Sequence, residues 1–449
     1  MIQKIPSLIF CAATAAYFLA CSSDTLSSAD DSSDGASDEL KQTYSLLEGY
    51  YYLADKELST LSSYVDTPYK VYIPDKFADD ADVLGMFYVM SDKLTRYYPS
   101  SLYNTVYTAL NESDHENKSF GMELDSNLVV KYVYREGPAN SAGINRRDTV
   151  ATVNGNTFQS LKDFNAYLSS VDSTDTFEFT VRHGKSTMDV SMTRTTLNLP
   201  TVYVDTVQGI PLIRITDFTN VTNGFEDNGT AYEFDDALEA TQGAKSTILD
   251  LRGNTGGFVS ICTYMASQLL SQDDILVYSE EWSPANSTNP KVTQLYTSKD
   301  GIGKGRYYVL MLDSSSASCT ELFAAAVTAN LNSPIVGTNS FGKAIGQIYK
   351  TTDKKGICGI THSLYFDKNK QTYHTLGFVP DYYIPDSLEA IDKAVELAKE
   401  GTAKRSAGYG TETQPYWTKS KSLYKKGITI NPEEDFRESL KGLAITQFE

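Results

Sequence analysis

The stretch Asp313-Ser-Ser-Ser-Ala-Ser-Cys-Thr-Glu321 decides the fold of this chain, because it joins an apolar run to an Ala-rich segment. We expect a strand that ends at Leu312, a turn of small residues, and a helix that begins near Ser318. A serine at such a helix N-terminus lies where backbone N–H groups favour developing negative charge. A second turn, Ser340-Phe-Gly-Lys343, follows. We interpret Ser318 and Lys343 as a candidate nucleophile and base.

Buried strands alternate with helices on both sides of this turn. The expected strands are Ile210–Ile215, Ser246–Leu251, Tyr307–Leu312, Pro334–Gly337, Ile357–Phe366 and Tyr373–Tyr383. The expected helices are Phe234–Ala240, Ile261–Leu270 and Leu388–Lys399. This alternation predicts a mixed α/β fold with a mainly parallel sheet that is covered by helices.

The chain of 449 residues is long enough for two to four domains. Apolar residues recur at helical spacing from Leu40 to about Ser113, whereas short β-type runs fill residues 119 to 197. A weak helical pattern near Glu434 to Leu440 lies in a polar C-terminal part. The expected units are 1–20 (signal peptide), 21–39 (flexible acidic tether), 40–118 (helical domain), 119–197 (β-rich domain), 198–400 (catalytic core) and 401–449 (extension).

Residues 1–20 combine Lys4 with a short apolar run, which is typical of a secretory signal and too short to span a membrane. The sequence Phe18-Leu-Ala-Cys21 resembles a bacterial lipoprotein cleavage site, although Phe18 stands where a branched aliphatic residue is usual. The resemblance implies that Cys21 is lipidated. The Ser- and Asp-rich segment Ser22–Glu39 is expected to be a flexible tether, and it resembles a surface-export signal of Bacteroidetes lipoproteins.

The composition argues against several classes of function. A formal net charge of −18 without a basic stripe argues against nucleic-acid binding. The five cysteines and four histidines show no metal-site spacing, so we expect neither a metal nor another cofactor. Cys262, Cys319 and Cys358 are expected to be small buried thiols rather than a disulfide framework.

The glycine-rich stretch Arg252-Gly-Asn-Thr-Gly-Gly257 opens another helix. Gly256 or Gly257, together with the amide of Cys319, could form an oxyanion hole if the two turns face one pocket. A phosphate-binding loop is the competing interpretation, but the Lys-Ser/Thr pair of such loops is missing. No histidine follows a motif that would bring it to the sheet end. A buried lysine can replace it, because burial lowers the pKa of an ammonium group.

Each of these residues also has a simpler interpretation. The pattern Ser318-x-x-Glu321 is a capping box, in which the serine only caps a helix. Lys343 alone would be a solvated lysine in a glycine turn. The spacing Ser340-x-x-Lys343 is formally that of a penicillin-recognising enzyme, but Gly342 argues against the helix which that motif needs.

Three motifs together resemble the tail-specific, or C-terminal processing, serine peptidases. They are Leu249-Asp-Leu-Arg-Gly-Asn-Thr-Gly-Gly257, Ser316-Ala-Ser-Cys-Thr-Glu321 and Phe341-Gly-Lys-Ala-Ile-Gly-Gln347. The resemblance implies a ClpP/crotonase-like peptidase core. It also implies that Ser318 is the nucleophile, Lys343 the base and Gln347 the residue that orients the lysine. Thr255, Cys319 and Ala344 depart from the family pattern, which has proline, alanine and glycine there.

The β-rich segment resembles a PDZ domain. The resemblance rests on Gly137-Pro-Ala139, Ala142-Gly-Ile144, Asp148 and Val153-Asn-Gly155 in this order. It implies that the backbone of Phe120, Gly121 and Met122 binds the carboxylate of a peptide C-terminus, while the peptide adds as a strand.

These features together predict a serine endopeptidase of the C-terminal processing type. Its expected partners are polypeptides with accessible C-termini and the membrane, through a lipid on Cys21; nucleic acid is not expected. The expected location is the cell envelope, either periplasmic or on the outer-membrane surface. The alternative is a PDZ-containing surface lipoprotein that binds peptides and has a weak or inactive peptidase core.

Overall fold

The structure is a computed structural model. It describes residues 26–28, 35–68, 72–92, 94–111, 116–134, 137–171, 175–198, 200–220, 222, 228–281, 290–414 and 444–448. Cys21, the expected signal peptide and the helical pattern near Glu434 to Leu440 lie outside these ranges. Among the described helices, none is both long and apolar enough to cross a membrane.

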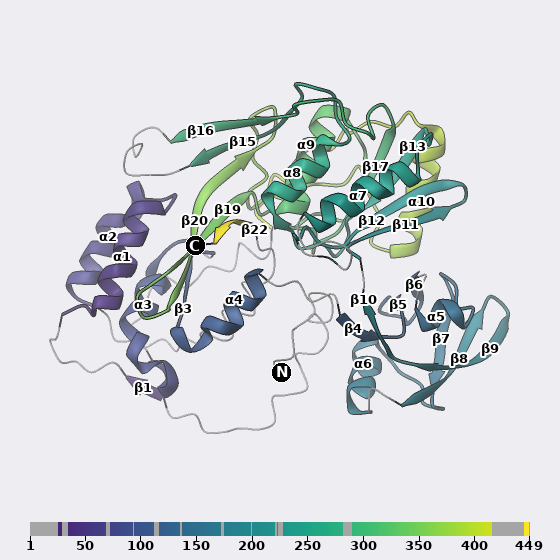
Figure 1. Cartoon of the computed structure of the whole chain (residues 1–449), viewed down its shortest axis with the longest axis horizontal. Coiled ribbons are helices and arrows are strands. Elements are labelled where there is room, and N and C mark those ends of the chain that lie inside the picture. Colours follow the sequence, from purple (N-terminus) through teal and green to yellow (C-terminus); the bar gives the residue numbers. More distant parts are fainter. Residues whose placement is uncertain are drawn as a thin grey trace.

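A six-stranded sheet forms the centre of the molecule (Figure 1). Its strands in spatial order are β11 (Val202–Val207), β12 (Ile210–Ile215), β13 (Ser246–Asp250), β17 (Tyr307–Leu312), β18 (Ile335–Gly337) and β21 (Tyr382–Tyr383). All neighbouring pairs are parallel except the β11–β12 hairpin. The predicted mainly parallel sheet and the mixed α/β fold are therefore confirmed.

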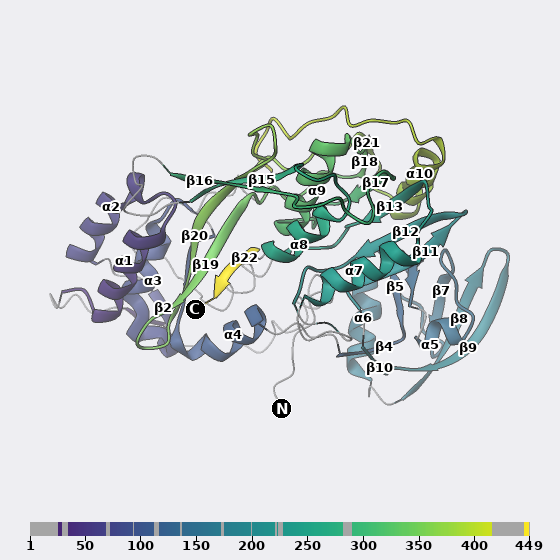
Figure 2. The same cartoon turned by 45° about the horizontal axis from the view of Figure 1, so that its top comes forward.

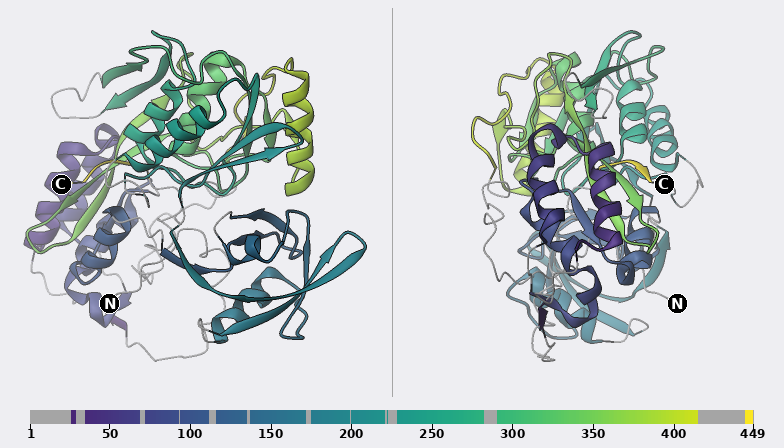
Figure 3. Two further views of the ribbon diagram at one scale, coloured as in Figure 1. Left: turned by 45° about the vertical axis from the view of Figure 1, so that its right-hand side comes forward. Right: turned by 90° about the vertical axis from the view of Figure 1, so that its left-hand side faces the viewer.

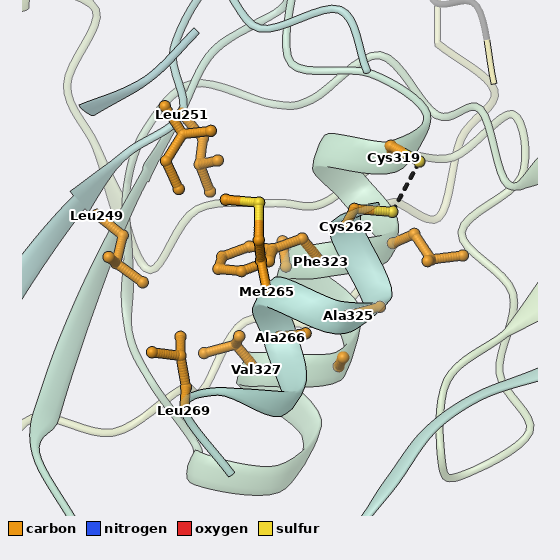
Figure 4. Close-up of a cluster of buried hydrophobic side chains, with 14 of the residues drawn as sticks. Leu249, Leu251, Cys262, Met265, Ala266, Leu269, Cys319, Phe323, Ala325 and Val327 are labelled. Atoms are coloured by element: carbon orange, nitrogen blue, oxygen red, sulfur yellow. Dashed lines mark hydrogen bonds between the residues drawn. The ribbon is translucent and has the colours of Figure 1, made fainter. Parts of the chain in front are cut away.

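Helices cover both faces of this sheet. They are α7 (Gly229–Ala240), α8 (Val259–Ser267), α9 (Cys319–Leu331) and α10 (Ser387–Glu400). Alternate residues of the central strands point to opposite faces of the sheet. Leu249 and Leu310 share a core with α7, α8 and α9, whereas Ile248 and Val309 pack against α10 on the other face. Figure 4 shows part of the first core, with Met265 and Phe323 at its centre. Strands buried on both faces explain the continuous apolar runs of the sequence.

A second sheet extends from the catalytic end of the first. Its spatial order is β14 (Gly257–Phe258), β22 (Ala444–Phe448), β19 (Ile345–Thr351), β20 (Ile357–Phe366), β15 (Ile275–Glu281) and β16 (Lys291–Tyr296), and β3 (Arg96–Tyr98) also pairs with β20. Of these strands only β20 was expected. Strand β19 begins two residues after Lys343, so the segment that follows the lysine is a strand that carries Gln347 into the sheet.

The N-terminal part packs against this second sheet. Its helices are α1 (Asp38–Tyr50), α2 (Ala54–Asp66), α3 (Ala81–Val89) and α4 (Tyr103–Asn111), with 3-10 turns η1 (Asp75–Asp80) and η2 (Ser100–Leu102). Ile348, Cys358 and Ile360 of the sheet share one core with these helices. The short strands β1 (Leu26–Ser28) and β2 (Tyr72–Pro74) pair with each other. Part of the segment expected as a flexible tether is therefore folded.

The β-rich segment forms a unit with a core of its own. Its elements are β4 (Glu116–Ser119), β5 (Met122–Leu124), β6 (Val130–Val133), α5 (Pro138–Ser141), β7 (Thr149–Val153), α6 (Leu161–Ser170), β8 (Thr176–His183), β9 (Ser186–Thr193) and β10 (Thr195–Asn198). Phe120, Phe177 and Phe179 meet edge to face in its centre. This unit and the N-terminal helices lie at opposite ends of the α/β core (Figures 1 and 2).

An ion pair joins the β-rich unit to the core. Arg214 Nη2 of β12 lies 2.8 Å from Glu123 Oε2 of β5, and the Tyr134 hydroxyl donates to the same carboxylate. The rings of Tyr132 and Tyr134 also pack against Tyr203 of β11. Figure 3 shows the unit beneath the hairpin of β11 and β12. The contact therefore couples β5 to the central sheet.

One expected strand is mostly absent. Of Tyr373–Tyr383, only Tyr382 and Tyr383 form a strand, β21. The preceding residues make a tight turn in which Leu376 N and Gly377 N both donate to Tyr373 O, and Gly377 has φ of 66°. Tyr373 and Phe378 of this segment are buried and pack onto the core instead. The segment is therefore apolar although it is not a strand.

Candidate active site

Ser318 is held in an uncommon backbone conformation at the start of α9. Its φ is 61° and its ψ is −120°, a combination that costs a residue with a side chain on the order of 1–3 kcal/mol. The neighbouring turn is fixed by the glycine-rich loop, since Ala317 N and Thr320 Oγ1 both donate to Asn254 O, at 3.1 and 2.9 Å. The expected strand, turn and helix are all present, and the loop constrains the turn.

The Ser318 hydroxyl is available for chemistry. The side chain is buried, with 2% of its surface exposed, and within the described residues its Oγ has no hydrogen-bond partner. A buried hydroxyl without a partner is unfavourable unless a ligand satisfies it. The predicted capping box of Ser318 and Glu321 is present at the start of α9, and its clearest bond is that from Ser318 N to Glu321 Oε2, at 3.0 Å.

Lys343 is fully buried beside the nucleophile turn, at 1% exposure. Its Nζ donates to Gln347 Oε1 at 2.9 Å. Burial lowers the pKa of Lys343 to about 7, and this effect outweighs the nearby charges of Asp92 and Glu321, which raise it. A substantial fraction of the lysine is therefore neutral near pH 7, which is what a general base requires.

Gln347 connects the lysine to the N-terminal part of the chain. Its Oε1 accepts from Lys343 Nζ, while its Nε2 donates to Leu94 O at 2.8 Å. The Leu94 carbonyl fixes the orientation of the amide, because an amide flip would bring its oxygen against that carbonyl. The segment before β3 is thus part of the site, a role that the sequence pattern did not reveal.

Glu321 is the residue of the site that sequence reasoning missed. It was considered only as a partner in a helix cap, yet its buried carboxylate accepts hydrogen bonds from both turns. Ser318 N and Lys343 N donate to Oε2 at 3.0 and 2.7 Å. Gly342 N at 2.7 Å and the Ser340 hydroxyl donate to Oε1. Burial raises the pKa of Glu321 to about 7, and the donors oppose this rise. One carboxylate therefore joins the turn of Ser318 to the turn of Lys343.

The same contacts exclude the interpretation as a penicillin-recognising enzyme. Ser340 to Lys343 do not form a helix, and the Ser340 hydroxyl is engaged by Glu321. The serine and lysine of that motif must instead lie one helical turn apart.

Ser318 Oγ and Lys343 Nζ are not hydrogen-bonded to each other, since Oγ has no partner within the described residues. The two residues are nevertheless neighbours in space, because their backbone amides share Glu321 Oε2. The structure therefore brings the turns that carry the two predicted residues together.

The glycine-rich loop lies directly against Ser318. A Cβ atom on Gly256 would stand 2.8 Å from Ser318 Cβ and 3.0 Å from Cys319 N. The Gly256 N–H donates to Asn254 Oδ1 at 2.9 Å, so it is not free to act as an oxyanion donor. Gly256 instead permits the close approach of the two turns. Gly257 and the Cys319 amide remain as the predicted donors.

Two thiols lie beneath the nucleophile. Cys262 Sγ of α8 is 2.7 Å from Cys319 Sγ (Figure 4), and burial raises the pKa of Cys319 well above its usual range. Cys262, Cys319 and Cys358 are buried free thiols, as the sequence predicted. His374 lies near the lysine turn, but burial lowers its pKa to about 4. It is therefore neutral at pH 7.

The predicted carboxylate loop of the β-rich unit is well ordered by internal contacts. Phe120 is buried in the core of the unit, and Gly121 N donates to Ser119 Oγ at 3.0 Å. The carbonyls of Phe120 and Gly121 accept from Ala139 N and Tyr134 N. Met122 begins β5. The role of these three residues in binding a peptide stays a prediction.

No cluster of three or more His, Cys, Asp or Glu side chains suited to a metal ion occurs within the described ranges.

Comparison with known families assigns both parts of the chain. Residues 209–384 match the family model of peptidase family S41, and residues 110–193 match that of the PDZ domain. The core is therefore similar to the domain of peptidase family S41. The matched segment contains Ser318, Lys343 and Gln347, and the PDZ match contains the carboxylate loop. The two domains support a serine protease of the C-terminal processing type.

Named relatives agree with the S41 assignment. The chain is 25% identical over 387 residues to the carboxy-terminal processing protease CtpA of Bacillus subtilis, covering 83% of this chain and 79% of that protein. It is 24% identical over 263 residues to a protein of Staphylococcus haemolyticus named as a CtpA-like serine protease, covering 57% of this chain. The chain spans half the length of that relative.

A solved structure from Bacteroides fragilis, named as an S41 protease, has a similar fold. The match covers 80% of this chain and 97% of the solved chain, with a TM-score of 0.55 and 14% sequence identity. At this level of identity the likeness concerns the fold alone.

Proposed function

We propose that this chain is an endopeptidase in which Ser318 is the nucleophile, Lys343 the general base and Gln347 the residue that orients the lysine. The observation that carries the proposal is the buried Lys343, whose pKa falls to about 7 beside a serine hydroxyl that has no hydrogen-bond partner within the described residues. Ordinary surface lysines have a pKa near 10.4 and cannot act as bases at neutral pH.

The reaction begins when Ser318 Oγ attacks the carbonyl carbon of the scissile amide. The neutral Lys343 Nζ takes the hydroxyl proton and then passes it to the leaving nitrogen as the C–N bond breaks. Water hydrolyses the resulting acyl-enzyme by the reverse proton route. A small movement that brings Oγ within hydrogen-bond reach of Nζ starts this sequence, and such contacts often tighten only when substrate is bound.

The amides of Cys319 and Gly257 are the proposed donors to the oxyanion. The Cys319 N–H lies at the N-terminus of α9, where the helix dipole favours negative charge. The close approach of Gly256 to Cys319 N aligns the glycine-rich loop with this amide. Preorganised donors of this kind stabilise the transition state without reorganisation during the reaction.

The PDZ domain is proposed to bind the C-terminus of a polypeptide substrate through the loop of Phe120, Gly121 and Met122. The adjacent strand β5 is joined to the core by the Glu123–Arg214 ion pair, which supports a link between peptide binding and the catalytic sheet. We further propose that Cys21 is lipidated and anchors the protein at the cell envelope, on the basis of the sequence Phe18-Leu-Ala-Cys21.

The test of the dyad compares wild type with Ser318→Ala and Lys343→Ala in turnover of an unfolded polypeptide with an exposed C-terminus. A general base contributes about 10²–10⁴-fold, so the lysine variant should lose at least about 100-fold in rate. Lys185→Ala serves as the matched control, because Lys185 is exposed on the β8–β9 turn. Equal turnover by all four proteins would show that the dyad assignment is wrong.

A fluorophosphonate probe distinguishes the alternative, an inactive peptide-binding protein. Covalent labelling of the wild type that disappears in Ser318→Ala supports the peptidase. Retained binding of a C-terminal peptide, with no labelling of the wild type, supports the alternative.

A further inference from the structure

Strand β22 lies inside the second sheet between two parts of the active site. It pairs with β14 on one side and with β19 on the other, and both pairings are parallel. In Figure 2 it is the yellow arrow beside β19, far from the preceding helix α10. A segment at residues 444–448 therefore completes the sheet at the catalytic end of the molecule.

The register brings β22 to the catalytic residues. Ala444 is opposite Gly257 of the glycine-rich loop, and Ile445 is opposite Gln347, which holds the lysine. Adjacent strands are about 4.7–4.9 Å apart. The backbone of β22 thus runs between the loop that touches Ser318 and the strand that orients Lys343.

We propose that the position of β22 is where an extended polypeptide substrate binds, and that Ala444–Phe448 occupies this position in cis and blocks it. The inference rests on the proposed peptidase function. The site takes its ligand mainly through backbone groups, because a strand flanked on both sides can satisfy its N–H and C=O groups in both neighbours. Polypeptide in extended form is therefore the class of ligand, with little demand on its sequence.

Without β22, the sheet would present two facing edges. Strands β14 and β19 would then expose the backbone groups that β22 now pairs, and open edges of this kind recruit other strands. A segment on the same chain competes at an effective concentration that can reach the order of millimolar. A substrate present at micromolar concentration must therefore displace it. The occupied arrangement is also the one in which Ser318 Oγ lacks a hydrogen bond within the described residues.

The central experiment weakens β22 in the full chain. The double variant Ile445→Pro/Thr446→Pro removes two backbone N–H groups from the strand, which disfavours its pairing. The matched control Ile445→Ala/Thr446→Ala keeps both N–H groups. Binding is measured in the Ser318→Ala background with a fluorescent peptide of the sequence Ala-Ile-Thr-Gln-Phe, so that the readout does not depend on hydrolysis.

We expect the proline variant to bind this peptide at least about tenfold more tightly than its parent, and the alanine variant to stay within about threefold of it. With Ser318 present, turnover of an unfolded polypeptide should rise by a similar factor in the proline variant. Equal peptide affinity in the proline variant and its parent would overturn the strand site.

Hydrogen exchange on the otherwise unaltered Ser318→Ala protein gives a second measure that needs no proline. The amides of residues 445–448 should be protected, and saturating unfolded polypeptide should remove their protection. Unprotected amides in the absence of ligand would overturn the proposal. Tight peptide binding by the proline variant without Ser318-dependent cleavage would refute the peptidase function and leave the strand site intact. If cleavage depends on Ser318 but neither double variant changes peptide binding or rate, the strand site is refuted and the peptidase function stands.

Discussion

Replacing Glu321 with glutamine tests whether one carboxylate really holds the nucleophile and the base together. The two carboxylate oxygens accept four hydrogen bonds, two each. Glutamine keeps one oxygen and turns an NH₂ group toward the other pair of donors. The side chain therefore cannot satisfy all four, and its orientation determines which pair is lost.

The less costly orientation points the NH₂ group toward Ser340 and Gly342. The Ser340 hydroxyl can rotate and accept a hydrogen bond, whereas the Gly342 N–H has no such choice. One buried N–H is then left unsatisfied, which costs about 1–3 kcal/mol. The opposite orientation leaves the N–H groups of both Ser318 and Lys343 without an acceptor. By the same rule, this costs about twice as much free energy.

We therefore expect the unsatisfied N–H to lower the free energy of unfolding of Glu321→Gln by up to about 3 kcal/mol, measured by urea denaturation at pH 8. The loss of a buried carboxylate whose pKa is raised to about 7 offsets part of this change. Labelling of Ser318 by a fluorophosphonate probe should slow as well, because the Gly342 amide next to Lys343 loses its anchor. Glu239→Gln is the control: Glu239 is exposed on α7, and such changes usually stay within about 0.5 kcal/mol. If Glu321→Gln matches wild type in both stability and labelling rate, the proposed role of this carboxylate is wrong.

Three further outcomes follow from the geometry. The rate of acyl-enzyme formation should rise tenfold per pH unit below about pH 7 and level off above it. The reason is that Lys343 must lose its proton to act as a base, and its pKa is about 7. A pH-independent rate would contradict this. Gly256→Ala should abolish probe labelling, because the added Cβ would lie 2.8 Å from Ser318 Cβ and the φ of this residue is 116°. Gly49→Ala is the control: its added Cβ would have no atom within 4 Å, so labelling should stay unchanged. Arg214→Met removes the 2.8 Å partner of the half-buried Glu123 carboxylate, which keeps the Tyr134 hydroxyl, and should lower the unfolding free energy by about 1.5–3 kcal/mol in calorimetry. An unchanged melting temperature would count against the importance of this contact.

Local pattern was sufficient for the central strands and for the turn that carries Ser318, whereas the roles of Ser318, Lys343 and Gln347 were implied by the family resemblance. The apolar runs at Ser246–Leu251 and Tyr307–Leu312 are strands because both faces are covered by helices. The small residues before Ser318 predict a sharp turn into a helix, and the structure contains that turn. These features depend on neighbours in sequence, so periodicity and turn chemistry reveal them.

The supporting contacts of the site depend on residues distant in sequence. Gln347 finds its partner carbonyl at Leu94, 253 positions away, and Glu321 reaches across to the turn that carries Lys343. No spacing rule predicts such pairs, because they arise only when separate elements pack and buried polar groups must be satisfied.

The sequence by itself therefore determined the α/β character of the chain and the candidates Ser318, Lys343 and Gln347. Only the tertiary structure decided that the lysine is buried enough to be neutral near pH 7, because desolvation depends on everything packed around its ammonium group. It also decided that Gly256 is a contact residue and not a donor, and that residues 444–448 lie between β14 and β19. The Gly256 result comes from the Asn254 side chain, which accepts the Gly256 N–H within the loop. The position of residues 444–448 comes from pairing between strands distant in sequence, which no local pattern encodes.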